Sequence, residues 1–579
     1  MLKFKLIDKC WQNVVGESTG GADFFLEKNE WDDFGYHTMY HLHATSKLTS
    51  EGHVYLGYIR IMKHGQEEHD IYLLNKQQGK QIVFSELPEN FVSLTTSIDV
   101  FKGLNKYLTQ AERLHFIKQM HLILDEESEY YKLVHEDDCF TVSLLRDTTM
   151  DNYSLKKGIS LLMDKATYYN LQQQSIKIKF ANVDEFTPLN FSCLPNFQSK
   201  NIPNGVITFI GKNGSGKSTS IYNLAKLMYA YPDQRFRLNE KIGKVEPNDI
   251  GINKLFLLSY SPFDNFVLPG IGGEDYRVIL EGLKNNDGRF VFCGIRDVES
   301  EFETILKNPQ KETYEKLFED TRLDATSLKP INVLADEFVQ AMNALEHDVN
   351  RNKIWDNIGR KSRRNFPEIE EMMDAFFILG DEVRKDNFLH LSTGYKYFFH
   401  SLAHIIAYIE EDSLILFDEP ENHIHPPMLS FMISSLRNIL SEYQSVMLIA
   451  THSPVIVQET FAKNVFVVRR YDGKTVISHP QIETYGANIS EITSEVFDLT
   501  TDITKYYDAF ESIYDKLEGE ENWQSVDGMV ESIEKHLDGA ISSQMLSYLI
   551  SLYIKIIQKN NKICGNYKSQ SFLTQKTTL

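Results

Sequence analysis

A glycine-rich loop in the middle of the chain has the residue types needed to hold a phosphate chain. Residues 211–218 read Gly-Lys-Asn-Gly-Ser-Gly-Lys-Ser, a complete G-x-x-x-x-G-K-[ST] pattern. An apolar run at 205–210 precedes the loop, and a run with helical spacing at 220–228 follows it. Glycines let the backbone N–H groups turn toward one anion, and the start of a helix adds a partial positive charge there. The pattern therefore predicts a strand, a phosphate-binding loop and a helix in succession.

The loop also predicts a role for each polar side chain. Lys217 is expected to reach the β- and γ-phosphates of a nucleotide, and Ser218 is expected to hold Mg²⁺. A glycine-rich turn that binds nothing is the alternative, but the Lys-Ser pair and both flanking runs argue against it. The residues expected to contact the nucleotide within the loop are Gly211, Asn213, Gly214, Ser215, Gly216, Lys217, Ser218 and Thr219.

Two acidic residues follow an apolar run at 413–417. Such a run is typical of a buried parallel strand that delivers carboxylates at its C-terminal end. Asp418 is predicted to hold Mg²⁺ through water, and Glu419 is predicted to orient and deprotonate an attacking water molecule. An acidic strand end without a chemical role is the alternative.

Two further segments place polar residues where strands or helices change into loops. Ser392 lies in the run Leu-Ser-Thr-Gly-Tyr-Lys at 391–396, in an N-cap position before a helical run at 397–409. His452 follows the apolar run 445–450. Taken alone, Ser392 is an ordinary helix cap and His452 is a satisfied histidine at a strand end.

The order of these four segments resembles the head of ABC-type ATPases, with phosphate loop, signature, acidic strand and histidine strand. The resemblance implies an ATP-linked homodimer or higher homo-oligomer, in which Ser392 and Gly394 contact ATP bound to the opposite subunit. It also implies that His452 touches the γ-phosphate and acts with Glu419 and Lys217 in catalysis. The glutamine of the family's Q-loop is missing from 258–264, where Ser259 and Asp264 are the candidates.

The sequence Asp-Glu-Pro-Glu-Asn-His-Ile-His-Pro at 418–426 resembles the SMC, OLD and RecF-like branch, of the AAA_15 and AAA_21 type. Lys396 after the signature fits the same branch. Asn422, His423 and His425 fall where that family has its D-loop, which crosses the dimer interface. Their alternative is an ordinary polar loop. The resemblance covers roughly residues 176–470, and it is specific at the motifs and weak between them.

The composition is that of a folded protein of the reducing cytoplasm. The chain has 579 residues, 42% hydrophobic residues and a net charge of −21, with no apolar stretch long enough to span a membrane and no secretory signal at its start. The five cysteines are scattered, which predicts neither a zinc site nor a disulfide framework; they are Cys10, Cys139, Cys193, Cys293 and Cys564.

An acidic chain repels nucleic acid on average, so any contact with DNA has to be local or come from a partner. One basic cluster surrounds Trp355. It either binds along the phosphates of a nucleic acid or forms a solvated helix face paired with the acidic run 368–371. Its members are Arg351, Lys353, Arg360, Lys361, Arg363 and Arg364.

The predicted fold class is α/β, a two-lobed ABC-type P-loop head with added regions. An N-terminal accessory α+β region is expected at 1–175, with a strand at 54–61 and a helix at 111–124. The first lobe is expected at 176–272, and a strand with a helical insertion at 273–385. The second lobe is expected at 386–490, and a helical C-terminal partner-docking region with a flexible tail at 491–579. The helices expected at this end of the chain run over 489–497, 505–517, 524–537 and 541–558. Within the insertion, helical periods run over 300–320, 334–358 and 367–384. In the SMC branch that the chain resembles, this position holds a long coiled-coil arm. A 25-residue helix reaches only ~38 Å, so the insertion is too short for such an arm.

The expected function is that of an ATP-binding and ATP-hydrolysing regulatory subunit of a bacterial anti-phage defence complex. The chain resembles the stand-alone ATPase subunit of Septu systems, whose implied partner is an HNH-type nuclease, sometimes with a retron reverse transcriptase and its noncoding DNA. No Asp-x-Asp follows His452 and no HNH pattern is evident, so the chain is not expected to cut DNA. The alternatives are a DNA-repair or recombination ATPase that binds DNA directly and a structural scaffold fixed by ATP. A transporter ATPase is the least favoured.

Overall fold

The computed structural model forms two compact units, Met1–Ile492 and Thr493–Leu579. It describes residues 1–555 with internal gaps, so the predicted tail, three of the cysteines (10, 193 and 564) and the start of one predicted helix at 505 lie outside the described residues. The residues outside the description are 8–17, 30–31, 51, 71–73, 75–82, 147–148, 165–170, 174, 181–182, 184, 192–203, 231, 247–249, 271–272, 308–316, 318–321, 379, 472–473, 498–505, 522, 524, 544 and 556–579.

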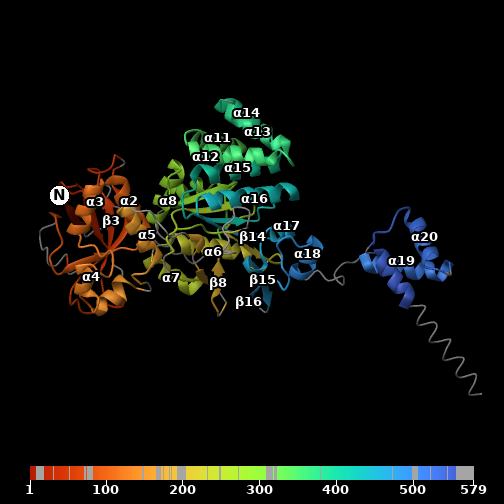
Figure 1. Ribbon diagram of the computed structural model, residues 1–579, viewed down its shortest axis with the longest axis horizontal. Coiled ribbons are helices and arrows are strands. Elements are labelled where there is room, and N and C mark those ends of the chain that lie inside the picture. The colour runs from red at the N-terminus through yellow and green to blue at the C-terminus, as the bar shows by residue number, and fades with distance from the viewer. Residues whose placement is uncertain are drawn as a thin grey trace, which may run out of the picture. The chain divides into compact units, whose positions relative to one another are not determined.

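A seven-stranded sheet forms the centre of the first unit, in the order β12-β11-β13-β14-β9-β15-β16 (Figure 1). All neighbouring strands are parallel except the last pair. The carboxyl ends of the parallel strands therefore share one edge of the sheet, which is where such sheets bind ligands. The strands are β9 (Val206–Ile210), β11 (Leu255–Ser259), β12 (Phe290–Gly294), β13 (Leu414–Asp418), β14 (Val446–Thr451), β15 (Val465–Tyr471) and β16 (Lys474–Ser478).

Both faces of this sheet are covered, which explains the continuous apolar runs in its strands. Alternate residues such as Leu257 and Leu416 point into a core with α6 (Lys217–Tyr229), α8 (Gly273–Asn285) and α9 (Val298–Lys307). Their neighbours point into a second core with α15 (Thr393–Tyr408) and α16 (Pro426–Glu442). A small sheet, β7 (Ser175–Phe180), β8 (Thr187–Asn190) and β10 (Gly243–Glu246), closes the first core, next to α7 (Pro232–Ile242).

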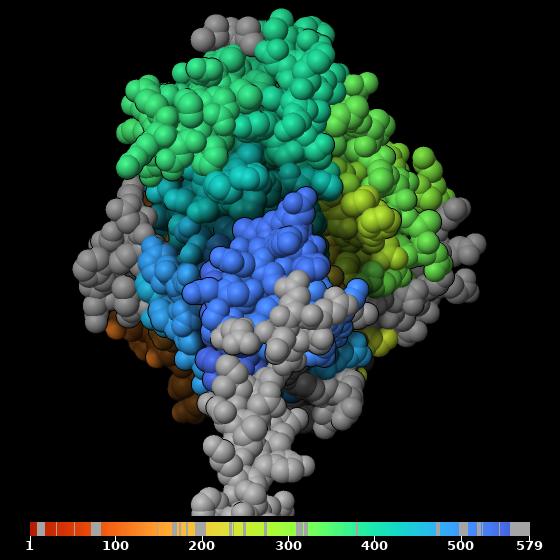
Figure 2. Space-filling view, turned by 90° about the vertical axis from the view of Figure 1, so that its right-hand side faces the viewer, coloured from red at the N-terminus to blue at the C-terminus, as the bar shows by residue number. Residues whose placement is uncertain are grey.

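Four helices form the insertion before the signature segment. They are α11 (Ile331–Glu346), α12 (Val349–Ser362), α13 (Pro367–Ile378) and α14 (Asp381–His390), and they form a compact block, green in Figures 1 and 2. The helical period predicted at 367–384 is wrong, because α13 ends at Ile378 and α14 begins at Asp381. The single helical period predicted at 334–358 is wrong as well. The helix breaks after Glu346, because the Asp348 side chain caps α12 by accepting the N–H groups of Asn350 and Arg351, at 2.9 and 3.1 Å.

The N-terminal part of the first unit is an α+β module. Its six-stranded sheet has the order β5-β1-β2-β3-β4-β6 and packs against helices around one apolar core. The predicted strand at 54–61 is confirmed within β4, and the predicted helix at 111–124 ends earlier, at Gln119. The elements are β1 (Phe4–Ile7), β2 (Phe24–Lys28), β3 (Met39–Ala44), β4 (Val54–Lys63), β5 (Val83–Phe84), β6 (Phe91–Leu94), α2 (Ile98–Tyr107), α3 (Gln110–Gln119), α4 (Glu129–Val134) and α5 (Tyr153–Leu162).

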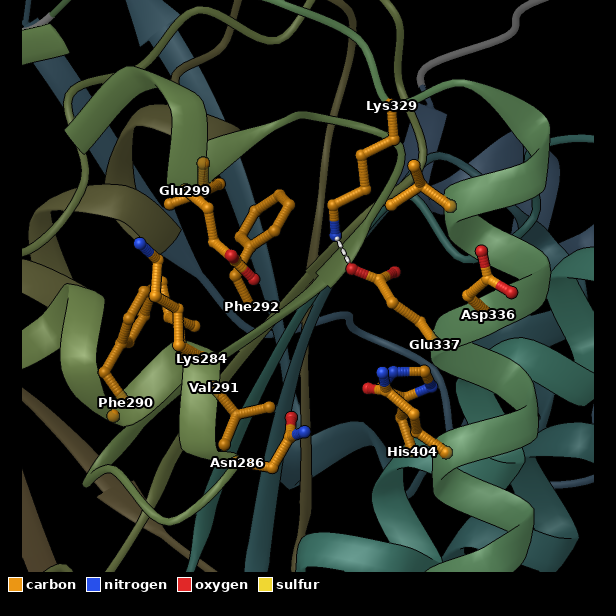
Figure 3. Close-up of a pocket in the computed structure, with 15 residues that line it drawn as sticks. Lys284, Asn286, Phe290, Val291, Phe292, Glu299, Lys329, Asp336, Glu337 and His404 are labelled. Atoms are coloured by element: carbon orange, nitrogen blue, oxygen red, sulfur yellow. Dashed lines mark ion pairs between the residues drawn. The ribbon is translucent and has the colours of Figure 1, made fainter. Parts of the chain in front are cut away.

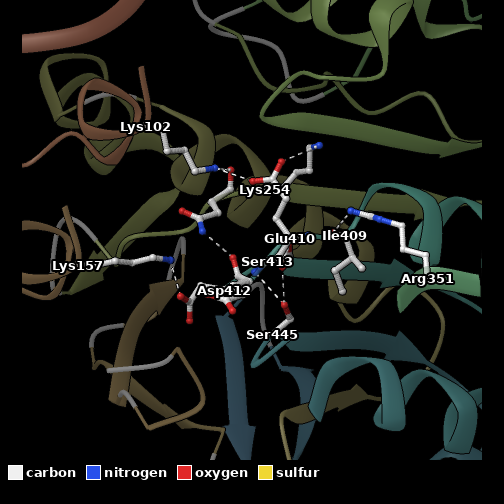
Figure 4. Close-up of polar contacts among 11 residues, drawn as sticks. Lys102, Lys157, Lys254, Arg351, Ile409, Glu410, Asp412, Ser413 and Ser445 are labelled. Atoms are coloured by element: carbon white, nitrogen blue, oxygen red, sulfur yellow. Dashed lines mark hydrogen bonds and ion pairs between the residues drawn. The ribbon is translucent and has the colours of Figure 1, made fainter. Parts of the chain in front are cut away.

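Two ion pairs, one of them buried, join this module to the central sheet (Figure 4). Lys157 of α5 pairs with Asp412, which also accepts the Leu171 N–H at 2.7 Å. Lys102 of α2 lies 2.8 Å from Glu410. Both acidic residues precede β13, so the module docks at the amino ends of the parallel strands, opposite their carboxyl edge.

The second unit is helical. α19 (Tyr506–Glu521), α20 (Val526–Leu537) and helical residues at 545–555 share a small core that includes Tyr514, Met529 and Leu549. α18 (Ile489–Phe497) precedes them. The helices predicted in this region are confirmed within a few residues where the structure describes them, and the predicted domain boundaries stay predictions. Among the described residues, no helix is both long and apolar enough to cross a membrane.

Candidate nucleotide site

The glycine-rich loop joins β9 to α6 at the carboxyl edge of the sheet. Gly214 and Gly216 have φ angles of 79° and 102°, a region that favours glycine. Gly211 is needed for a different reason, because a Cβ there would lie 2.2 Å from the Val468 carbonyl oxygen of β15. The backbone of the neighbouring strand thus fixes where the loop begins, and the loop residues predicted from the sequence lie together here.

Lys217 lies inside the loop. Its side chain is buried, and its ammonium group donates to the carbonyl oxygens of Gly211 and Lys212, at 2.8 and 3.3 Å. Burial lowers the pKa of Lys217, while the carboxylates of Glu419, Asp418 and Glu421 favour the charged form. An ammonium held by neutral carbonyls is ready to transfer to phosphate oxygens, because charge-assisted hydrogen bonds are stronger.

Ser218 and Asp418 come together as the sequence predicts. The Ser218 hydroxyl donates to Asp418 Oδ1 at 3.0 Å, and the Asp418 side chain is buried. Burial raises the pKa of Asp418 to about 8, helped by the nearby carboxylates of Glu419 and Asp264, although Ser218 and Lys217 act in the opposite direction. A carboxylate in such a place is stabilised by a cation.

The residues around this pair fit Mg²⁺. Ser259 ends β11 beside Asp418 in the sheet register, and its hydroxyl is buried with no hydrogen-bond partner among the described residues. The Ser215 hydroxyl in the loop is also buried and has no hydrogen-bond partner among the described residues. These oxygens, with Ser218 and Asp418, supply the hard ligands and water contacts that Mg²⁺ prefers. Ser218 and Asp418 would hold the ion, which when bound neutralises and orients the phosphates.

Glu419 is held where it can reach a water molecule. Its N–H donates to the Ala450 carbonyl at 2.8 Å, and the Asn422 amide donates to its carboxylate at 3.3 Å. Its φ angle of 48° lies in the left-handed region, which is uncommon for a glutamate and costs about 1–3 kcal/mol. Strain of this kind is concentrated at functional sites, and here it aims a partly exposed carboxylate at the edge of the sheet.

Glu421 has a role that the sequence did not predict. One of its oxygens accepts the Thr451 hydroxyl at 2.6 Å and the His452 N–H at 2.7 Å, and lies 3.1 Å from His452 Nδ1. His452 Nδ1 is also 3.7 Å from Glu419. Glu421 therefore fixes the histidine beside the proposed base. Its place in the Asp-Glu-Pro-Glu motif was the available signal.

The signature segment lies at the start of α15. Ser392 occupies the N-cap position as predicted, but its side chain makes no capping hydrogen bond and is exposed, so it is accessible to a second molecule. Gly394 packs against the next loop, because a Cβ there would lie 2.6 Å from the His423 carbonyl oxygen. The signature and the predicted D-loop therefore lie against each other.

The two candidates for the Q-loop role, Asp264 and Ser259, differ in their contacts. Asp264 is buried, accepts a hydrogen bond from the Tyr222 hydroxyl and lies 3.8 Å from Arg296. Burial raises the pKa of Asp264 to about 6, and Arg296 opposes this shift. These contacts make Asp264 a structural residue, whereas Ser259 adjoins Asp418.

The basic cluster at 351–364 is largely a paired surface. Trp355 is buried, Arg351 donates to the carbonyls of Ile406 and Ile409, and Arg363 lies 2.6 Å from Glu370. Arg360 and Lys361 contact Asp356 and Asn438, respectively. Among these contacts, the pair of Arg363 with Glu370 is the one that involves the acidic run 368–371, and the alternative of a DNA contact stays a prediction.

Residues 206–458 match the family model AAA_21, described as an AAA domain, putative AbiEii toxin, Type IV TA system. The matched region contains the phosphate loop and most strands of the α/β P-loop fold described above. A curated relative, Protein ea59 of Escherichia phage lambda, is 25% identical over 523 residues, which cover 88% of this chain and 91% of the relative.

Solved structures that match part of this chain include an ATP-binding cassette and an SMC head. The ADP conformation of an ABC-transporter cassette is 13% identical and covers 55% of this chain and 94% of its own, with a TM-score of 0.24. The SMC head bound to the C-terminal winged-helix domain of ScpA is 15% identical and covers 53% and 96%, with a TM-score of 0.21. The strand order and the motifs at its carboxyl edge define the fold of this chain.

Proposed function

We propose that this chain hydrolyses ATP and uses the cycle to join and release two copies of its ATPase domain. The observation that carries the proposal is the contact between Ser218 and Asp418, with Lys217, Glu419 and His452 at the same edge of one sheet. Groups that bind phosphate, hold a cation and activate water are thereby brought together from three strands.

The side chains divide the chemistry of hydrolysis. Lys217 binds phosphate oxygens and stabilises the charge that develops on them. Glu419 accepts a proton from the attacking water, a contribution worth typically 10²–10⁴-fold in rate. Glu421 holds His452 against the same carboxylate, so that the imidazole can donate to a phosphate oxygen.

The exposed signature serine supports a dimer in which each ATP is shared. Ser392 caps nothing in its own subunit and begins α15, whose N-terminus favours anions. In this proposal Ser392 and Gly394 bind the γ-phosphate of the partner's ATP. Native mass spectrometry tests it: ATP should convert monomer to dimer in the wild type and not in Lys217→Ala. The matched control is Lys212→Ala in the same loop. A monomer–dimer ratio unaffected by ATP would refute the shared site.

We further propose that the cycle controls a partner nuclease in anti-phage defence, with the helical C-terminal region as the docking element. The toxin–antitoxin description of the matching family and the resemblance to a defence ATPase subunit support this role. The chain should be expressed from its own operon and captured with and without ATP. Recovery of a small HNH-type nuclease, lost when residues 506–555 are deleted, is the expected result. Recovery of DNA alone would favour the repair-factor alternative instead.

A further inference from the structure

A buried cluster away from the nucleotide site brings together Cys293, His400 and His404. Cys293 lies on β12, and the two histidines lie one turn apart on the same side of α15. One ligand atom from each residue lies within 4.8 Å of the others, and Cys293 Sγ is 3.4 Å from His400 Nδ1. Zinc bonds of about 2.0–2.3 Å in tetrahedral geometry separate sulfur and nitrogen ligands by roughly 3.5 Å. The side chains are therefore close to the spacing that one ion requires.

In each histidine, one ring nitrogen lies beside an oxygen that is not one of the candidate ligand atoms, and the other ring nitrogen is the candidate metal ligand. His404 Nδ1 lies 2.9 Å from the His400 carbonyl oxygen, which can only accept, so Nδ1 carries the hydrogen and Nε2 keeps a lone pair. His400 Nε2 lies 3.3 Å from Glu337, which Lys329 holds at 2.7 Å. Metal-binding histidines ordinarily donate their second N–H to a carbonyl or a carboxylate in this way.

The Tyr260 hydroxyl also contacts two members of the cluster. Its hydroxyl lies 2.8 Å from His400 Nδ1 and 3.2 Å from Cys293 Sγ, and accepts the Ser401 hydroxyl at 2.7 Å. When no ion is bound, this hydroxyl is therefore a hydrogen-bond partner of both His400 Nδ1 and Cys293 Sγ.

A cavity of about 260 Å³ is lined by His404 and Glu337, but not by Cys293 or His400. Figure 3 shows Lys284, Phe290 and Val291 on one side of it, and Glu337 and His404 on the other. The cavity therefore meets the cluster at His404, and a fourth ligand, water or a small anion, would approach the ion from that side.

We propose that Cys293, His400 and His404 form a binding site for a transition-metal ion of the Zn²⁺ type, with its open position toward this cavity. The single cysteine explains why cysteine spacing in the sequence predicts no such site. A bound ion joins the edge strand β12 to α15, the helix that begins at the signature. The site would then stabilise the contact between the sheet and the helix that carries Ser392.

The full-length chain, stripped with a chelator and kept free of nucleotide, is titrated with Zn²⁺ against a chromophoric competitor and, separately, with Co²⁺. The expected result is one ion per chain and a thiolate-to-cobalt charge-transfer band. Cys293→Ser and His404→Gln should each weaken binding at least ~100-fold, and Glu337→Gln by about 10–100-fold. The matched control is Cys139→Ser, a second buried cysteine, which should bind like the wild type.

The wild-type spectrum decides the question even if a variant fails to fold. Absence of a stoichiometric ion, or a Co²⁺ complex without a thiolate band, would overturn the proposal. So would a folded Cys293→Ser protein that binds Zn²⁺ as tightly as the wild type. Each readout is independent of ATP turnover, so failure of the proposed function would leave this test intact.

Discussion

The ion pair between Lys157 and Asp412 should hold the N-terminal module on the domain that contains the seven-stranded sheet. The side chains are 3% and 4% exposed, and Asp412 also accepts the Leu171 N–H. Asp412 has a φ angle of 55°, a conformation that asparagine tolerates well. Asp412→Asn therefore keeps the shape and the backbone, removes the charge that faces the buried ammonium group, and replaces one of the two acceptor oxygens with an NH₂ donor.

Removing one partner of a buried ion pair costs about 3–5 kcal/mol, because the other charge is left without compensation. Since about 1.4 kcal/mol is a factor of ten, α5 should open roughly 10²–10⁴-fold more often. Hydrogen–deuterium exchange measures this opening as lost protection of the amides of residues 153–162, while the amides of α20 in the second unit should keep theirs.

Asp151→Asn is the matched control, because Asp151 pairs with Lys156 on the same helix but is 84% exposed. An exposed pair contributes about 0–1 kcal/mol, so this variant should exchange almost like the wild type. Adding Lys157→Met to Asp412→Asn should recover much of the protection, because no unpaired charge remains. The reasoning is refuted if Asp412→Asn changes the protection of α5 no more than Asp151→Asn does.

Three further predictions concern the nucleotide site and the pH dependence of stability. Gly394→Ala should abolish ATP-dependent dimers in native mass spectra, because its Cβ would meet the His423 carbonyl at 2.6 Å; Gly380→Ala, which meets nothing within 4 Å, should not. Equal dimer yields would contradict this. Ser218→Ala should lower ATP affinity in Mg²⁺ but not in EDTA by calorimetry, and an equal loss in both would contradict the assigned role. Burial raises the pKa of Glu410, but its two lysine partners lower it to about 2. Its stabilising effect is present above pH ~4.3 and is lost as the pH falls toward 2. The difference in melting temperature between the wild type and Glu410→Gln should therefore shrink over that range, and a constant difference would count against the ion pairs.

The motif residues could be predicted from the sequence because their chemistry is local. The loop at 211–218 needs glycines and one Lys-Ser pair, and β13 ends at Asp418 with Glu419 directly after it. Parallel strand order then brings these ends together, as the contact between Ser218 and Asp418 shows.

Other features depend on neighbours that are distant in the sequence. Glu421 acquires its role only because β14 lies beside β13, and Cys293 meets His400 across 107 residues. The break between α11 and α12 was missed because apolar residues continue at helical spacing through it, while the cap is a single aspartate. The N-terminal module is attached through ion pairs between residues distant in the sequence, which no local sequence pattern predicts.

The most direct test of the central claim is ATP turnover by Glu419→Gln compared with the wild type, with ATP binding measured in parallel. The account predicts that the wild type hydrolyses ATP, and that the variant binds ATP equally well but is slower by about 10²–10⁴-fold. The variant should also accumulate as an ATP-bound dimer. Turnover by Glu419→Gln at the wild-type rate would contradict the assignment of the base. A wild-type protein that binds ATP but never hydrolyses it would leave the site as a structural clamp.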